Sequence, residues 1–195
     1  MLMFEYIKGS VISLTPAAIV VEAGEIGYFI HISLTTYSLL HGSEKAKLFL
    51  HQVIREDAHI LYGFFDQTER ELFRLLISVN GIGANTAIMM LSSHKPDEIQ
   101  HAILNENVGF LKNIKGIGIK TAQRVIIDLK DKVGKSAAGD LLFRSGENPV
   151  RSEAVAALEM LGFNKKAVEK LVDQVLTEQP AIAVENLIKL ALKSF

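Results

Sequence analysis

Hydrophobic and polar residues alternate in short runs over the first 65 residues, with turn-forming residues between the runs. Five segments rich in Ile, Val, Leu, Phe and Tyr cover residues 5–14, 17–22, 27–34, 46–54 and 58–64. Pro and Gly mark the breaks between them, as at Pro16, Gly24 and Gly42. Five short strands with no long helix between them predict a small antiparallel barrel, either OB-like, which we favour, or SH3-like.

From Asp66 onward the spacing of the apolar residues becomes helical. Asp66 is suited to cap a helix over residues 66–79, with Glu69 as its capping-box partner. Residues 96–98, Pro-Asp-Glu, are typical of a first helical turn, with Ser93 as a candidate cap.

A helix that begins after Gly118 is expected to reach Val133 and to end at Gly134. Residues 135–149 mix Ser, Gly, Asn and Pro without a sustained period, which predicts a flexible linker.

The last segment shows three amphipathic periods that predict a minimal helical bundle. The helices are expected at about 151–161, 165–176 and 181–193, with Gly162 closing the first and Pro180 starting the third. Because three short helices enclose little volume, the bundle favours a docking module over a site with a deep pocket. The sequence thus predicts an α+β protein with a barrel at 1–65, a helical domain at 66–134, a linker at 135–149 and a bundle at 150–195.

A glycine motif occurs twice in the helical region, 35 residues apart. Residues 79–87 read V-N-G-I-G-A-N-T-A and residues 114–122 read I-K-G-I-G-I-K-T-A. Each copy joins two apolar helical segments through a turn whose glycines permit positive φ. The isoleucine between the glycines, Ile82 or Ile117, is expected to turn inward and hold the turn against the core.

Backbone N–H groups at the start of the second helix would then face solvent at the positive end of the helix dipole, where a phosphate binds well. A single copy is more often an ordinary helix connection, but two copies in phase are hard to explain by packing. Neither a dinucleotide-binding fingerprint nor a P-loop is matched. The motif resembles a tandem helix-hairpin-helix, which grips a nucleic-acid backbone regardless of sequence. The candidate DNA-binding residues are Gly81, Ile82, Gly83, Asn85, Thr86, Lys115, Gly116, Ile117, Gly118, Lys120, Thr121 and Arg124.

The net charge of −1 is unlike that of a typical nucleic-acid binder, but the charge is unevenly distributed. Residues 1–70 hold 5 Lys and Arg against 8 Asp and Glu, residues 71–135 hold 9 against 6, and residues 136–195 hold 7 against 8. Four of the cations surround the second glycine turn, where the free amides are expected.

Other chemistry finds little support in the sequence. The chain has no Cys, no run of membrane-spanning length and no signal-peptide pattern, so we expect a cytoplasmic protein. The six His residues lack metal-ligand spacing, and we expect neither a metal nor a cofactor. One acidic pair stands out, Glu56-Asp57. It is either a solvated turn or a pair that repels phosphates beside a DNA-binding surface.

The segment R-E-D-A-H-I-L-Y-G-F at 55–64, followed by two G-I-G hairpins, a loose linker and a small terminal bundle, resembles the RuvA family of Holliday-junction-binding subunits. M-F-E-Y-I-K-G at 3–9, D-L-K-D-K at 128–132 and A-V-A-A-L-E-M-L-G-F at 154–163 extend the resemblance over nearly the whole chain. The terminal bundle also resembles a ubiquitin-associated (UBA-like) domain.

The resemblance implies a homotetramer, or an octamer, that holds a four-way junction open and binds its arms through the minor-groove backbone, in recombination and repair. It implies that Glu56 and Asp57 form an acidic pin near the crossover. It further implies that the bundle contacts the hexameric ATPase RuvB through Leu158, Leu161 and Phe163, and that the resolvase RuvC is a further partner. Catalysis would lie in RuvB.

Two departures from the family pattern each lose a cation. Ala84-Asn85 stands where the family usually has Pro-Lys, and Ile119-Lys120-Thr121 stands where it usually has Lys-Lys-Thr. Two alternatives stay open. A generic duplex-DNA adaptor would bind junctions no better than linear DNA, and a helix-hairpin-helix glycosylase would need a base pocket and a catalytic acid such as Asp128 or Asp131.

Overall fold

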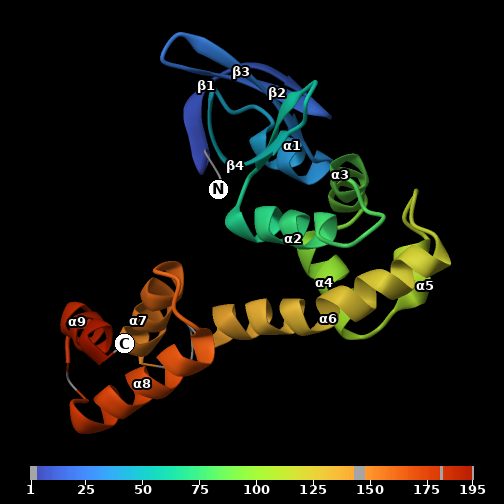
Figure 1. The fold of residues 1–195 in the computed structure, drawn as a ribbon. Helices are drawn as coiled ribbons and strands as arrows, with labels where there is room; N and C mark the ends of the chain where they lie inside the picture. The colour runs from blue at the N-terminus through green and yellow to red at the C-terminus, as the bar shows by residue number, and fades with distance from the viewer. Residues whose placement is uncertain (1–3, 143–147, 181, 195) are drawn as a thin grey trace. The chain divides into compact units, whose positions relative to one another are not determined.

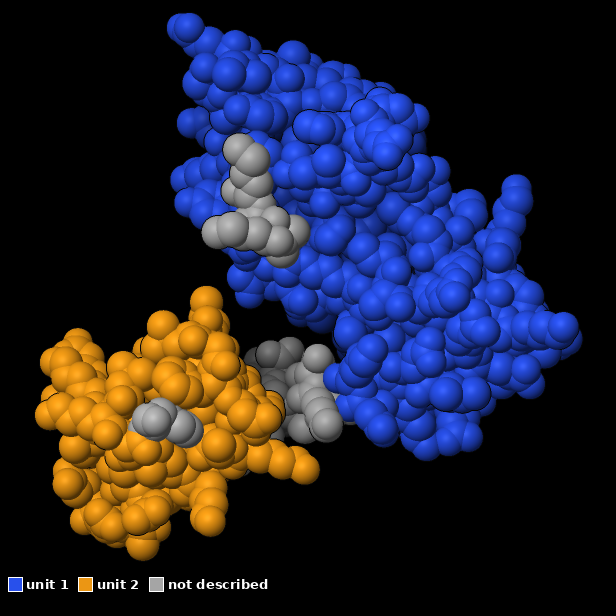
Figure 2. All heavy atoms as spheres, viewed as in Figure 1, with its two compact units in different colours: residues 1–135 blue, residues 136–195 orange. Residues whose placement is uncertain are grey.

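The structure is a computed structural model that describes residues 4–142, 148–180 and 182–194, without the side chains of residues 134–142 and 149. The chain forms two compact units, residues 1–135 and 136–195, coloured separately in Figure 2. None of the helices within the described ranges is long and apolar enough to cross a membrane.

Unit 1 begins with the predicted five-stranded barrel. The strands are β1 (Tyr6–Thr15), β2 (Ala18–Ala23), β3 (Ile26–Ile32), β4 (Lys45–Ile54) and β5 (His59–Phe64). They close in the order β1-β2-β3-β5-β4, with β3 and β5 parallel and the other pairs antiparallel. This order confirms the OB-like prediction. Nine buried apolar side chains fill the barrel, among them Ile19, Ile30 and Leu48.

A short helix, α1 (Leu34–Leu40), lies between β3 and β4 and was missed by the sequence analysis. Its residues include β-branched and aromatic types, which favour strands. Tertiary contacts override that preference. The Ser33 hydroxyl accepts a hydrogen bond from the Thr36 amide at 3.0 Å and donates to Glu69 Oε1, while the Thr36 hydroxyl donates to Glu69 Oε2 at 2.6 Å.

Five helices follow the barrel in the described part, and the last of them continues past residue 135, where unit 1 ends. They are α2 (Gln67–Ile77), α3 (Ala84–Ser93), α4 (Pro96–Leu104), α5 (Val108–Lys112) and α6 (Ile119–Leu142). Helix α2, green in Figure 1, contacts β4 and β5 of the barrel as well as α3 and α4. One apolar core extends from Tyr62 and Phe64 of the barrel through α2 to α6, so the barrel and the hairpins share buried surface.

Three details of the predicted helix ends are wrong. Asp66 does cap α2, because its Oδ1 accepts from the Glu69 amide at 2.8 Å, but the Glu69 carboxylate is engaged by α1 and completes no capping box. Ser93 ends α3 instead of capping α4, whose N-cap is Lys95. Helix α6 continues past Gly134 to Leu142.

An interior glycine costs a helix only about 1 kcal/mol relative to Ala, and the Ala, Lys and Leu residues that follow Gly134 favour helix. The predicted linker, 135–149, therefore starts inside α6, and its residues 143–147 lie outside the described residues.

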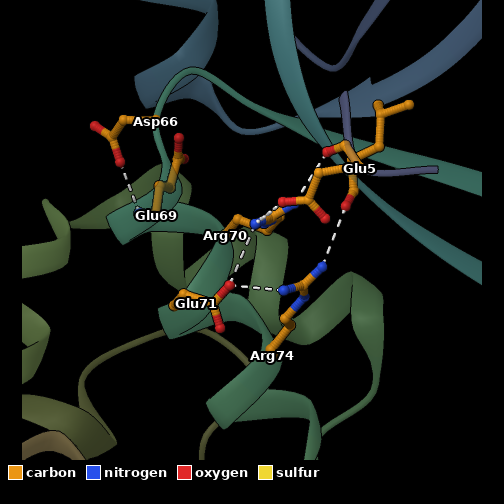
Figure 3. Close-up of polar contacts among 7 residues, drawn as sticks. Glu5, Asp66, Glu69, Arg70, Glu71 and Arg74 are labelled. Carbon is orange, nitrogen blue, oxygen red and sulfur yellow. Dashed lines mark hydrogen bonds and ion pairs between the residues drawn. The ribbon is translucent and has the colours of Figure 1, made fainter. Parts of the chain in front are cut away.

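Arginines of α2 tie the barrel to the helices, as Figure 3 shows. Arg70 is buried; its guanidinium donates to the Glu5 carbonyl at 3.0 Å and pairs with the Glu5 carboxylate at 2.6 Å. Arg74 pairs with Glu71 at 2.6 Å and donates to the Leu50 carbonyl of β4 at 3.5 Å. The Arg70 guanidinium holds the pKa of Glu5 below its usual range. The barrel is thus fixed to the helix that leads into the first hairpin.

Unit 2 is a three-helix bundle of α7 (Pro149–Met160), α8 (Lys165–Glu178) and α9 (Val184–Ser194). Its core is formed by seven buried residues: Ala154, Val155, Leu158, Val168, Val172, Leu187 and Ala191. Gly162 follows α7 with a φ of 96°, as predicted for a glycine that closes a helix. Pro180 does not start α9; it lies in a turn closed by the Ile182 amide and the Gln179 carbonyl, where proline suits the second position.

Candidate nucleic-acid interface

The two glycine motifs form equivalent turns in unit 1. Gly81 and Gly116 have φ values of 97° and 89°, which residues with a Cβ rarely adopt. The second glycine of each motif takes an ordinary conformation and starts the next helix; Gly83, the N-cap of α3, has a φ of −88°. The turns are closed alike, because Ile82 N donates to Val79 O and Ile117 N to Ile114 O, both at 3.0 Å.

Ile82 and Ile117 are each 5% exposed and belong to the shared core of unit 1. The prediction that they turn inward is confirmed. Burying the middle residue of each turn forces the flanking glycine backbone outward, and both Gly83 and Gly118 are exposed. Each turn therefore exposes glycine backbone without a bulky side chain, which lets a ligand approach the amides closely.

The amides at the start of the second helix of each hairpin are available to a ligand. Gly83 provides no side-chain cap, so the first-turn amides of α3 have no side-chain acceptor from the N-cap position. Gly118 equally lacks a side chain that could cap α6. Lys115 and Lys120 are exposed beside the second turn, and neither makes an ion pair with another described residue. Free amides, a helix dipole and mobile cations together attract an anion such as phosphate.

Two candidate residues are already hydrogen-bonded within the protein. Arg124 donates from Nη1 to the Asn80 carbonyl at 3.3 Å, which links α6 to the first turn. Asn85 accepts from the Tyr62 hydroxyl at 3.2 Å, which links the first hairpin to β5. Burial raises the pKa of Tyr62, so its hydroxyl stays protonated and able to donate. Tyr62 was not identified from the sequence; only its place in the 55–64 segment marked it.

The two hairpins lie against each other. A Cβ added at Gly116 would lie 3.4 Å from Met89 Cε and 4.0 Å from Thr86 Cγ2, both on α3. The departures from the family pattern fall here as well. Ala84 is buried, whereas Ile119 is exposed at the start of α6.

The acidic pair lies at the tip of a tight turn between β4 and β5. Arg55 and Ala58 close this turn through reciprocal backbone hydrogen bonds of 2.8 and 3.5 Å. Glu56 and Asp57 are the two residues between them, and both are exposed. The pair thus belongs to the turn that joins β4 and β5, where both residues are exposed.

The three candidate docking residues of the bundle differ in exposure. Leu158 is fully buried in the core of unit 2, and Phe163 is partly buried against it. Leu161 is 60% exposed, next to Met160 at 89%. Leu158 is therefore part of the bundle core, whereas Met160, the last residue of α7, and Leu161, its C-cap, are exposed apolar residues.

Comparisons with known proteins agree with this arrangement. The family model "RuvA N terminal domain" matches residues 3–63, "SAM-like Helix-hairpin-helix tandem" matches residues 73–131, and "RuvA, C-terminal domain" matches residues 149–194. These matches cover nearly the whole barrel, both glycine turns and the three helices of the bundle.

Similar proteins from other organisms extend over the same length. "Holliday junction branch migration complex subunit RuvA" of Christiangramia forsetii is 49% identical over 191 residues, covering 98% of this chain and 99% of the relative. The protein of the same name from Bacteroides thetaiotaomicron is 50% identical over 199 residues with the same coverage, and that of Flavobacterium psychrophilum is 47% identical over 192. With these matches and this fold, the chain belongs to the RuvA family.

Proposed function

We propose that this protein binds four-way DNA junctions through the phosphate backbone and holds them for branch migration. The observation that supports this most directly is the pair of equivalent glycine turns, each presenting uncapped helix amides. Two such sites in one rigid unit suit the two strands of a duplex arm, since their phosphates face each other across the minor groove. Contacts to phosphate carry no sequence information, so binding would be independent of sequence.

In this proposal the amides of both hairpins and the side chains of Lys115 and Lys120 bind phosphate oxygens, with Thr86 and Thr121 close to the same amides. The loss of a cation at Asn85 and at Ile119 makes the protein depend more on its backbone donors. A hydrogen bond from a backbone N–H to a phosphate oxygen is charge-assisted, and it requires no side chain to become ordered.

The acidic turn supplies the preference for junctions. Glu56 and Asp57 would repel phosphates from the space around them. In a continuous duplex, phosphates follow one another along both strands without interruption. The centre of an open junction, by contrast, contains a space without phosphates. We therefore assign the pair the role of a pin that tolerates only an opened crossover, and the alternative of a plain solvated turn predicts no effect on this preference.

We further propose that the bundle docks the ATPase RuvB through Met160 and Leu161, and that this protein contributes no catalysis itself. An exposed pair of long apolar side chains beside a positive-φ glycine is a surface that a partner can cover. Phe163 supports that surface from the bundle side. We also propose that four copies of the protein assemble as a homotetramer. The exposed apolar side chains of Tyr6, Ile12 and Phe29 on the barrel would be suited to contacts between the copies.

The proposed binding of DNA phosphates by the hairpins can be tested by neutralising the phosphates one at a time. Junctions would be synthesised with single methylphosphonate linkages along one arm, and the dissociation constant of each would be measured. We expect a loss of affinity at a few positions on both strands of the arm, on either side of one minor groove. Uniform affinity at all positions would refute a phosphate grip by the hairpins.

A further inference from the structure

Each hairpin turn is supported by the second helix of the other hairpin, at positions equivalent in the repeat. The repeat of 35 residues pairs Met89 of α3 with Arg124 of α6. Met89 lies on the turn of the second hairpin, since its Cε would be 3.4 Å from a Cβ at Gly116. Arg124 lies on the turn of the first hairpin, where its Nη1 donates to the Asn80 carbonyl at 3.3 Å.

The two contacts are reciprocal but chemically different. Met89 makes an apolar contact through a flexible thioether, and it is 39% exposed. Arg124 makes a charge-assisted hydrogen bond to a carbonyl just before the positive-φ glycine Gly81. A guanidinium held by a backbone carbonyl has fewer orientations than a free one, and its bonded N–H faces the protein.

We propose that Arg124 and Met89 are positioning residues that set the distance between the two phosphate-binding turns, and that Arg124 is not itself a phosphate ligand. This inference rests on the proposed function. It differs from the expectation drawn from the sequence, in which Arg124 was grouped with Lys120 among the residues that bind DNA.

The physical reason is that two rigid turns must fit two phosphates at once. The core holds each turn through Ile82 or Ile117, and the contacts made by Met89 and Arg124 add a direct connection between the two turns. Binding at two linked points loses much of its advantage when the geometry does not match, because the second contact then requires distortion. A residue that connects the two turns directly can therefore affect the affinity for DNA without contacting the DNA.

The salt dependence of binding separates a positioning residue from a ligand. Each phosphate neutralised on duplex DNA contributes about −0.9 to the slope of log K against log salt. For Arg124→Ala we expect affinity for a four-way junction to fall roughly three- to tenfold, the effect of about one net hydrogen bond, at an unchanged slope. Lys120→Ala should flatten the slope by about one. Lys132→Ala, on the exposed side of α6, is the matched control for loss of a charge.

Two further variants sharpen the test. Arg124→Gln keeps an N–H donor and removes the charge, so it should bind more tightly than Arg124→Ala and keep the wild-type slope. Met89→Ala carries no change of charge and should weaken binding about two- to fivefold at an unchanged slope, through lost dispersion contacts. A thermal melt shows whether Arg124→Ala folds. If it does not, the Met89→Ala variant still tests the proposal.

The separation of α3 and α6, the helices that follow the two turns, can be measured without DNA. The chain contains no Cys, so Ser93→Cys and Ile127→Cys provide two unique attachment sites for spin labels on α3 and α6. Ile127 is 79% exposed and Ser93 is at the exposed end of α3. We expect the distance distribution between the labels to broaden in Arg124→Ala and in Met89→Ala.

A flatter slope for Arg124→Ala would overturn the proposal and return this residue to the ligands. Unchanged affinity in both Arg124→Ala and Met89→Ala would overturn it as well. DNA binding would then not depend on the distance between the turns that these two residues are proposed to set. If instead the wild-type protein showed no affinity for junctions, the proposed function would fail, while the spin-label distances would still report whether these residues hold the turns apart.

Discussion

Replacing Lys120 by Ala should change protein stability and DNA affinity in opposite directions. Lys120 is the second residue of α6, and a cation in the first turn of a helix is repelled by the positive end of the helix dipole. The side chain is exposed and makes no ion pair among the described residues to offset this repulsion. We therefore expect Lys120→Ala to raise the free energy of unfolding by about 0.3–1 kcal/mol.

The same change should weaken binding because one phosphate loses its cation. A slope of about 0.9 per phosphate corresponds to an affinity difference of about 3.5-fold between 50 and 200 mM salt. The wild type should therefore lose about 3.5-fold more affinity than Lys120→Ala over that range. The two affinities should converge as salt rises, because the lost interaction is the one that salt screens.

Fluorescence anisotropy of a labelled junction at five or more salt concentrations gives the slope, and urea unfolding at low salt gives the stability. Lys132→Ala serves as the control, since this exposed lysine lies well inside α6, away from both turns. A lower stability of Lys120→Ala would rule out repulsion by the helix dipole, and a slope equal to that of the wild type would rule out a phosphate contact of Lys120.

Three other perturbations test separate parts of the account. Glu56→Gln combined with Asp57→Asn should keep or raise affinity for DNA while reducing the preference for a junction over duplex; a collapse of binding in a protein that melts normally would contradict the pin. Leu158→Ala should lower the stability of the bundle by about 2–5 kcal/mol, as for a buried leucine, whereas Leu161→Ala should leave its melting unchanged and remove binding of RuvB, measured by calorimetry. Burial raises the pKa of Glu69, so the folded state holds this proton more tightly than the unfolded state; the stability linked to it is present below the unfolded pKa and lost as pH rises through the folded value. Glu69→Gln should therefore gain stability relative to the wild type as pH rises above about 4.5, and a difference that is constant with pH in urea titrations would contradict this.

The sequence predicted those features that depend on local chemistry. Alternating apolar residues and turn formers located all five strands, and the doubled G-I-G motif located both turns and the burial of Ile82 and Ile117. Gly162 was identified because only a glycine closes a helix easily with a positive φ. These signals work because each requires a residue type at one position.

The features that were missed depend on residues far apart in the chain. Helix α1 exists because Ser33 and Thr36 find Glu69, more than thirty residues later, and a local pattern cannot show such a partner. The hydrogen bond from Arg124 to the Asn80 carbonyl, 44 residues earlier, is likewise not visible in a local pattern. Leu158 and Leu161 are three residues apart in the same apolar segment, and only the packing of the bundle distinguishes core from surface.

Competition between a four-way junction and linear DNA shows whether this protein recognises the junction itself. A labelled immobile junction at about 0.1 M salt would be displaced by unlabelled junction or by linear duplex with the same arm sequences. We expect that far more duplex than junction, per base pair, is needed to displace half of the labelled DNA. Equal displacement by duplex and junction would contradict the account and leave a general duplex-binding adaptor.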